Sequence, residues 1–265
     1  MLEYKNDIIK NYVFNCLKYI EINQIECSSC KKILESIKDL PQYQLLLKCI
    51  IHKEVKIYTD ALTNLFNKNF YSNFILPFSL QRKSDWKNIE NFWNVPIFKD
   101  EDRAFFILVD IGNFKKINDN FSYKTGDHFL KTFGYFLIKE DVKFAIRNGG
   151  DEFILIIPSR RKTISLLRKF EDVSFIKNLN YNICKMHILL ERQTQSIPLS
   201  NEHNIVYVGA GFQEINLNKI RKYIKTKNAR AYEQYMNHIE SKAARYMKKN
   251  KQKIKRNINI ISYRD

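Results

Sequence analysis

The sequence predicts an α/β (α+β) protein, in which a helical segment precedes a central mixed sheet flanked by helices. Three observations lead to this fold class. Residues 3–58 carry apolar side chains at helical spacing and show no strand pattern. Residues 104–110, AFFILVD, form an apolar run of a length typical of a buried strand. Residues 143–157 hold two more strand-like runs around a glycine turn, which indicates an antiparallel hairpin.

The remaining elements follow from the same periodicities. Residues 125–138 have helical spacing, and residues 204–212 read as a strand. A long basic helical region is expected over about 218–250, followed by a last strand in INIISY, residues 258–263. We therefore divide the chain into an N-terminal helical region, 1–57, that dimerises or senses, and a second domain, 58–265, with a helix running into it.

Composition and charge restrict the class of protein. The chain has 265 residues, 45% of them hydrophobic, which is enough for a sizeable core. No apolar run approaches the roughly 18 residues of a membrane span, and the N-terminus does not resemble a signal peptide. Five cysteines without a secretion signal favour reduced thiols or metal ligands over disulfides. These features lead us to expect a cytoplasmic protein.

The excess of positive charge suits a polyanionic partner. Lys and Arg number 45 against 28 Asp and Glu, a formal net charge of +17. A nucleotide, a nucleic acid or an anionic membrane surface would fit, although a generally lysine-rich composition explains the charge equally well. The lysines of the region 218–256 are better read as a solvated helix face than as a nucleic-acid contact, so nucleic acid is not an expected partner.

Three carboxylates are candidates for chemistry. Asp110 ends the apolar strand 104–110, at an edge of the sheet where ligands bind in α/β folds. Asp151 and Glu152 lie in the hairpin turn beside Gly149 and Gly150, which let the backbone approach a ligand closely. Like charges gathered in this way repel unless a cation joins them, and oxygen ligands suit Mg²⁺ or Mn²⁺. An ordinary solvated turn is the alternative.

Four motifs in a fixed order carry a family resemblance. The hairpin turn reads Gly-Gly-Asp-Glu-Phe over residues 149–153 and is preceded by Arg147. Upstream lie DALTNLFNKNFY, in which Asn64 replaces a glycine, and VDIGNFKKINDNFSYKTGDHFL; downstream lies SKAARYMKKNKQK. Together they resemble the GGDEF family of diguanylate cyclases over about residues 58–263, and four ordered motifs are far more specific than one.

The resemblance implies a palm-like nucleotidyl cyclase fold and an activity. A homodimer of such domains condenses two GTP molecules into 3′,5′-cyclic diguanylate, a bacterial second messenger, with release of pyrophosphate. The family's roles fall on Asp110 and Asp151 as ligands of two Mg²⁺ or Mn²⁺ ions, helped by Glu152 and the carbonyl of Ile111. Asp151 would also accept the proton of the attacking hydroxyl.

The same resemblance implies the nucleotide contacts. Asn118 and Asp127 would read the guanine edge, since an amide and a carboxylate pair with its donor face. Basic side chains that match the family's phosphate contacts are Lys115, Lys249 and Lys253. The glycines 149 and 150 belong to the same substrate-binding group.

Some positions depart from the family pattern. Gly112 stands where many relatives have a second Asp, and Ser122 and Tyr123 replace Gly-His, so Tyr123 is a candidate for altered nucleotide contact. Many relatives have Arg-x-x-Asp before the signature for product inhibition, whereas this chain reads EDVK over Glu140–Lys143. An acid in place of a phosphate-binding arginine predicts no product inhibition there.

A second candidate site lies in the N-terminal region. Cys27-x-x-Cys30 and Cys49-x-x-His52 have the spacing of structural zinc ligands, and a helical hairpin turning at Pro41 would bring the pairs together. Cysteines on apolar helix faces are also common core residues, so zinc and plain packing both remain open.

Two other functions compete with the cyclase. One is an inactive module that binds GTP or cyclic diguanylate and signals by contact. The other is a palm-type cyclase that makes a different cyclic or linear oligonucleotide, for which Tyr123 leaves room. The intact acids Asp110, Asp151 and Glu152 favour an active enzyme, and Asn118 with Asp127 favours guanine.

Overall fold

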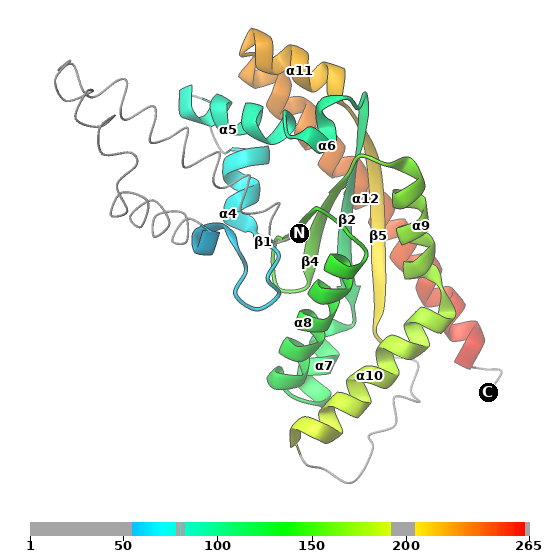
Figure 1. Ribbon diagram of the computed structural model, residues 1–265. Helices are drawn as coiled ribbons and strands as arrows, with labels where there is room; N and C mark the ends of the chain where they lie inside the picture. The colour runs from blue at the N-terminus through cyan, green and yellow to red at the C-terminus, as the bar shows by residue number, and fades with distance from the viewer. Residues whose placement is uncertain (1–54, 78–79, 81–82, 192–204, 263–265) are drawn as a thin grey trace, which may run out of the picture.

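The computed structural model describes residues 55–77, 80, 83–191 and 205–262 (Figure 1). The four proposed zinc ligands, Cys27, Cys30, Cys49 and His52, lie outside the described residues, as does the N-terminal region up to residue 54. Within the described ranges, every helix is too short or too polar to traverse a lipid bilayer.

A single mixed sheet organises the described residues. Its strand order is β1-β3-β4-β2-β5, with β1 parallel to β3 and every other neighbouring pair antiparallel. The strand bounds are β1 Phe66–Asn67, β2 Arg103–Gly112, β3 Phe144–Arg147, β4 Glu152–Ile157 and β5 Tyr207–Asn216. The strand that carries Asp110 therefore lies between β4 and β5 and is hydrogen-bonded on both sides.

Helices cover both faces of the sheet, which gives three layers (Figure 1). On one face the even-numbered residues of β2 and β4, such as Phe106 and Ile154, pack in a core that includes Phe92, Tyr232 and Met236. The elements on this side are α4 Lys68–Phe70, the π-helical turn η1 Tyr71–Ile75, α5 Lys83–Trp93, α6 Pro96–Lys99, α11 Leu217–Thr226 and α12 Ala229–Ser262.

The odd-numbered residues of the same strands face a second core. Ile107 and Phe153 pack there with residues such as Phe133 and Phe170. The elements on this side are α7 Phe114–Asn120, α8 Tyr123–Lys139, α9 Arg160–Glu171 and α10 Val173–Glu191. Burial on both faces explains why 104–110 is a continuous apolar run rather than an alternating one.

Polar residues set several helix starts. The Ser122 hydroxyl accepts a hydrogen bond from the backbone N–H of Thr125 at the start of α8, and Asn216 accepts one from Lys219 at the start of α11. Ser159 does the same for α9. Each cap satisfies a backbone donor that has no partner inside its helix. The mixed sheet with helices around it, the hairpin and the helix over 125–138 are as the sequence predicts.

The basic region is helical as predicted, and the expected last strand is wrong. The basic region is divided between α11 and α12, because Lys227 adopts a left-handed conformation (φ 51°) and the Asn228 side chain caps α12. Residues 258–262, expected as a strand, continue α12 as helix. A short apolar run does not distinguish strand from helix, and Ile254, Ile258 and Ile261 also fit helical spacing.

Candidate active site

The carboxylate of Asp110 is positioned by the middle of the sheet. Asp110 lies opposite Glu152 of β4 and opposite Gly209 of β5 in the two antiparallel registers. Directly opposed residues project on the same face, so Asp110 and Glu152 lie side by side on the face that α12 covers. The Asp110 side chain is 18% exposed, which leaves it reachable from solvent while two neighbouring strands hold its backbone.

The turn that joins β3 to β4 is closed by backbone hydrogen bonds. The N–H of Asn148 donates to the carbonyl of Glu152 over 2.9 Å, and the N–H of Ile111 donates to the carbonyl of Asp151 over 3.1 Å. The second bond ties the turn to the end of β2. The two acids of the turn are therefore held next to Asp110 by the main chain itself.

The two glycines of the turn face open space. A Cβ at Gly150 would meet nothing within 4 Å, and one at Gly149 would meet only Glu152. Neither glycine has a positive φ, so the turn does not need their conformational freedom. What they provide is room beside the acids for the close approach of a ligand.

Arg147 connects the turn to a distant part of the chain. Its guanidinium donates to the carbonyls of Gly149 and Gly150 and to the carboxylate of Asp60, with the Nη1 to Oδ1 distance 3.2 Å. Burial acts to raise the pKa of Asp60, but hydrogen bonds from Thr63 and the charge of Arg147 outweigh it and lower that pKa. Arg147 thus fastens the Gly-Gly turn to the segment that leads into the domain.

Asn64 supports that same segment. Its φ is 57°, in the left-handed region where glycine is favoured and asparagine is among the best-tolerated alternatives. Residues 60–65 fold back on themselves, with the N–H of Asp60 donating to the carbonyl of Leu65 over 2.8 Å. The replacement of a glycine by Asn64 therefore preserves the turn that presents Asp60 to Arg147.

Asp151 is electrostatically linked to Asp110. Burial raises the pKa of Asp151, and the nearby charge of Asp110 raises it further, while Lys251 and Arg147 act in the opposite direction. A carboxyl group of this kind takes up a proton more readily than an ordinary aspartate. Two interacting carboxylates such as Asp110 and Asp151 are typical of a functional site in which they share a proton or bind a cation.

The space beyond Gly112 is filled by an aromatic ring. A Cβ at residue 112 would lie 2.1 Å from the Cζ atom of Tyr207, so the Tyr207 ring lies directly against the Gly112 backbone. Burial, and then the charge of Asp110, raise the pKa of Tyr207 to about 12. The departure at Gly112 is thus matched by a tyrosine on β5 that lies close to Asp110.

Lys251, which is not among the lysines predicted from the sequence, contacts Asp110. The Lys251 ammonium of α12 donates a hydrogen bond to Asp110 Oδ1 and forms an ion pair with it. A Cβ at Gly209 would lie 2.2 Å from Lys251 Cγ, so this glycine makes room for the lysine stem to cross β5. A glycine inside a strand opposite a candidate acid is a sequence signal for such an approach.

The two lysines predicted from the family pattern take other positions. Lys249 and Lys253 each lie two residues from Lys251 on α12, roughly 200° around the helix axis. Lys253 pairs with Glu171 of α9 at 2.8 Å, and Lys249 is exposed. Of these three lysines, the structure brings Lys251 to the acid.

The proposed guanine-reading residues lie where α7 packs on α8. A Cβ at Gly126 would lie 2.0 Å from Asn118 Oδ1, so the Asn118 side chain lies against the α8 backbone one residue before Asp127. Asp127 and Lys115 are exposed, and Tyr123 is 77% exposed at the first residue of α8. Asn118 therefore lies against the residue that precedes Asp127 in the chain, and Tyr123 lies one helical turn before Asp127.

A cavity of about 420 Å³ with a mixed polar and apolar lining lies beside the turn on the α12 side. Its lining includes Asn148 and Glu152 from the turn region and Glu240 from α12. The Glu240 carboxylate accepts a hydrogen bond from the Tyr71 hydroxyl, and burial raises the pKa of Glu240, with Glu152 adding to the effect. This cavity places Glu152 at an accessible edge of the site.

The donor set fits a hard divalent cation in part. Asp110 and Asp151 are close enough to couple, and the ammonium of Lys251 already supplies positive charge at Asp110. Within the described ranges, no three His, Cys, Asp or Glu side chains converge as a ready set of ligands. A Mg²⁺ or Mn²⁺ ion here would take its other ligands from the Ile111 carbonyl, water or phosphate, which is the usual arrangement for Mg²⁺.

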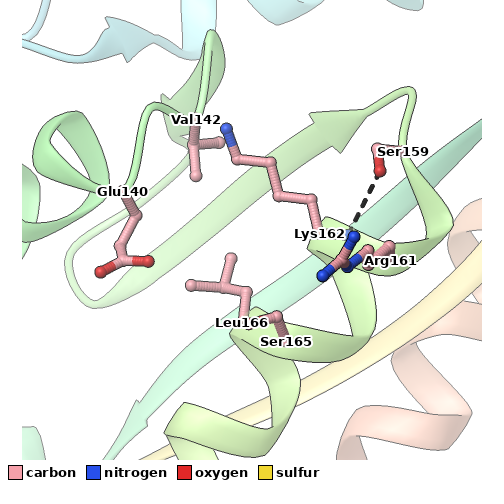
Figure 2. Close-up of a pocket in the computed structure, with 7 residues that line it drawn as sticks. All are labelled: Glu140, Val142, Ser159, Arg161, Lys162, Ser165 and Leu166. Atoms are coloured by element: carbon pink, nitrogen blue, oxygen red, sulfur yellow. Dashed lines mark hydrogen bonds between the residues drawn. The ribbon is translucent and has the colours of Figure 1, made fainter.

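A second pocket contains the position at which many relatives of the resembled family carry a phosphate-binding arginine (Figure 2). Its volume is about 260 Å³, and it is lined by Glu140, Val142, Ser159, Arg161, Lys162, Ser165 and Leu166. Both carboxylate oxygens of Glu140 accept hydrogen bonds from Lys169 Nζ at 2.7 Å. Lys162 donates to the Asp141 carbonyl, so two cations near this pocket are held by the chain's own oxygens.

Comparison with known proteins assigns the middle of the chain to a family. Residues 57–177 match the family described as diguanylate cyclase, GGDEF domain. These residues belong to the GGDEF family. The match contains Asp110 and the whole signature hairpin and ends inside α10, so β5 and α12, with Tyr207, Gly209 and Lys251, lie beyond it.

Curated GGDEF proteins resemble part of the chain. Diguanylate cyclase DgcS of Shewanella oneidensis is 31% identical over 131 residues, covering 47% of this chain and 38% of DgcS. Diguanylate cyclase DgcP of Escherichia coli is 33% identical over 116 residues, covering 42% of this chain and 29% of DgcP. The matches thus span less than two fifths of either relative.

Among solved structures, the chain is similar to the coiled coil and GGDEF domain of DgcB from Caulobacter crescentus in complex with c-di-GMP. Sequence identity is 18% and the TM-score is 0.37, with 76% of this chain and 92% of that chain covered.

Proposed function

We propose that the protein is a diguanylate cyclase that condenses two GTP molecules into cyclic diguanylate and two pyrophosphates. The observation that carries the proposal is the approach of Asp110 to Asp151 at an intact Gly-Gly-Asp-Glu-Phe hairpin. The named activities of the two curated relatives support the same reaction class.

In this proposal each residue has a defined task. The 3′-hydroxyl oxygen of each GTP attacks the α-phosphorus of the other, both bonds to pyrophosphate break, and each hydroxyl proton passes to the Asp151 of one domain. The raised pKa of Asp151 suits a proton acceptor better than that of an ordinary aspartate. Asp110, Glu152 and the Ile111 carbonyl would hold Mg²⁺ or Mn²⁺, which when bound offsets the charge on the attacking and leaving oxygens.

Specificity for guanine is assigned to the α7–α8 junction. The Asn118 amide and the Asp127 carboxylate offer an acceptor and donor set that pairs with guanine and is left unsatisfied by adenine. Lys115, exposed in the first turn of α7, is available for phosphate charge. Ring closure needs two GTP molecules face to face, so the proposal includes a homodimer in which each domain contributes one.

The test is product identification by chromatography after the full chain is incubated with GTP and Mg²⁺. We expect cyclic diguanylate from the wild type and none from Asp151→Ala. The matched control is Asp100→Ala, which removes an exposed carboxylate at the end of α6 and should keep full activity. Sedimentation of the same samples, with and without GTP, measures the dimer.

One observation favours a second candidate, a module that binds GTP or cyclic diguanylate without turnover. Lys251 pairs with the acid that the chemistry needs, and the described residues hold no preformed set of three metal ligands. Nucleotide binding without product at any Mg²⁺ or Mn²⁺ concentration would establish this function. Incubation with equimolar GTP and ATP separates both candidates from a cyclase that makes mixed products.

A further inference from the structure

We propose that Lys251 is an intramolecular counter-ion that competes with the divalent cation for Asp110. The inference rests on the proposed function only in taking Asp110 as a cation ligand. Lys251 lies outside the segment matched to the GGDEF family, and its ion pair with Asp110 joins residues 141 positions apart. The ammonium and a metal ion would both bind Asp110 Oδ1.

The position of Lys251 is set by close packing of α12 on β5. A Cβ at Gly211 would lie 2.1 Å from the backbone nitrogen of Met247, so the helix backbone comes directly against the strand. One turn further along α12, Asn250 accepts a hydrogen bond from the N–H of Ala210 and donates to Glu171. These contacts fix the start of the Lys251 side chain.

Gly209 then directs the lysine stem toward the acid. A Cβ there would lie 2.2 Å from Lys251 Cγ and 2.9 Å from its Cδ, so only glycine leaves this path across β5. Gly209 is also the residue opposite Asp110 in the register of β2 and β5. The strand position beside the acid is therefore shaped for the lysine that reaches it.

Charge balance explains what the lysine does there. Asp110, Asp151 and Glu152 are gathered at one end of the sheet, and Lys251 acts on Asp110 directly and on Asp151 through its charge. Before a metal ion binds, the ammonium offsets the repulsion among these carboxylates. A metal ion that ligates the same oxygen must first break the ion pair, which weakens its binding.

The ion pair is of the kind that can be broken. Lys251 is 28% exposed, and a lysine carries its charge on a flexible stem of four carbons. Removal of the ammonium should therefore leave Asp110 available to a metal ion without disturbing the strand. We expect Lys251→Met, which keeps an apolar stem over Gly209, to bind Mn²⁺ about fivefold more tightly than the wild type, the upper end for a partly exposed pair.

The experiment titrates Mn²⁺ into the full chain without nucleotide and follows free Mn²⁺ by electron paramagnetic resonance. The matched control is Lys253→Met, which removes the same charge two residues along α12 from a pair with Glu171 and should leave Mn²⁺ affinity unchanged. Asp110→Asn should lose the binding. Circular dichroism checks that each variant is folded.

A second variant displaces the Lys251 ammonium from Asp110 without removing its charge. Gly209→Ala forces the Lys251 stem aside and should also raise Mn²⁺ affinity, by a smaller factor. Equal affinities in wild type, Lys251→Met and Gly209→Ala would overturn the competition and leave the cyclase proposal intact. If neither wild type nor Lys251→Met binds Mn²⁺ without nucleotide, the competition for Asp110 is overturned, while the cyclase proposal is still decided by product identification with GTP and Mg²⁺.

Discussion

The ring of Tyr207 lies against the backbone of Gly112, so that a Cβ at residue 112 would be 2.1 Å from Tyr207 Cζ. This contact joins the end of β2 to the start of β5, within two residues of Asp110. It also explains how the chain accommodates glycine where many relatives have an acid, because the aromatic ring fills the space and is itself buried.

Gly112→Ala should destabilise the protein by about 1–3 kcal/mol, the usual cost of overpacking. The new methyl group collides with a buried ring that neighbouring atoms hold in place. Urea denaturation measures the change in the free energy of unfolding. Gly150→Ala is the control, since its methyl group meets nothing within 4 Å and should change stability by no more than about 0.5 kcal/mol. Equal stabilities of the two variants would contradict the packing of Tyr207 on Gly112.

Gly126→Ala should weaken discrimination for guanine. Its Cβ would lie 2.0 Å from Asn118 Oδ1, so the amide must leave the position at which we propose that it contacts guanine. We expect KM for GTP to rise about tenfold, as for the loss of one good hydrogen bond, with a smaller effect on ATP. Initial rates with each nucleotide measure this, and Lys131→Ala, an exposed change on the same helix, is the control. A Gly126→Ala protein with unaltered GTP preference would remove Asn118 from the guanine site.

Asp60→Asn should destabilise the protein at neutral pH by about 1–2 kcal/mol. This is the expected loss for a charged hydrogen-bonding group that is half-buried and therefore partly screened by solvent. Although burial acts to raise it, the pKa of Asp60 in the folded protein is lowered by Thr63 and Arg147 from its usual value of 3.8. When folding lowers the pKa of a carboxyl group, the group stabilises the folded protein at pH values above its unfolded-state pKa. This stability is lost as the pH falls through its folded-state pKa.

The stability gap between wild type and Asp60→Asn should therefore close as the pH falls below about 4. Thermal or urea unfolding of both proteins at several pH values measures the gap. A gap that is constant with pH would show that Asp60 acts through packing rather than through its charge.

Asp151→Asn should remove activity and yet stabilise the metal-free protein at neutral pH. Burial and the charge of Asp110 raise the pKa of Asp151. When folding raises the pKa of a carboxyl group, the stability that the group contributes is present below its unfolded-state pKa and is lost as the pH rises through its folded-state pKa. At pH 7 the ionised Asp151 is therefore unfavourable to folding. We expect a gain on the order of 0.5 kcal/mol, because Asp151 is only partly buried. Unfolding in EDTA measures it, and a loss of stability would contradict the repulsion between Asp110 and Asp151.

Cyclic diguanylate should not inhibit the proposed cyclase activity through the pocket at Glu140. Lys169 holds both carboxylate oxygens of Glu140, and an acid there repels phosphate. Initial rates with and without added product should be equal, and titration should give no binding that depends on Lys169 or Arg161. Submicromolar product that binds at this pocket and slows turnover would overturn the prediction.

The elements around the acids could be predicted because their signals are local. The apolar run 104–110, the hairpin around Gly149 and Gly150, and the helix that contains Gly126 each depend on neighbouring residues, and the structure contains all three. The closeness of Asp151 to Asp110 could also be predicted, because a hairpin turn next to the end of a neighbouring strand lies at the same edge of the sheet as that strand end.

The contacts between distant segments could not be predicted in the same way. The motif in α12 carries several lysines, and its spacing does not fix which of Lys249, Lys251 and Lys253 faces the sheet, since the helix phase is set by its packing on Gly211. Gly112 and Tyr207 are far apart in the sequence, and neither is unusual alone. The helix over 258–262 was missed because a short apolar run fits two periodicities.

The pairing of β5 with β2 over ten residues limits how this protein can be shortened. A fragment that stops at residue 177, where the family match ends, would strip one side of β2 and leave a row of unpaired amide and carbonyl groups along the strand that bears Asp110. Such a fragment would be prone to self-association, so the smallest piece worth expressing for work on the acids extends at least through Lys251 of α12.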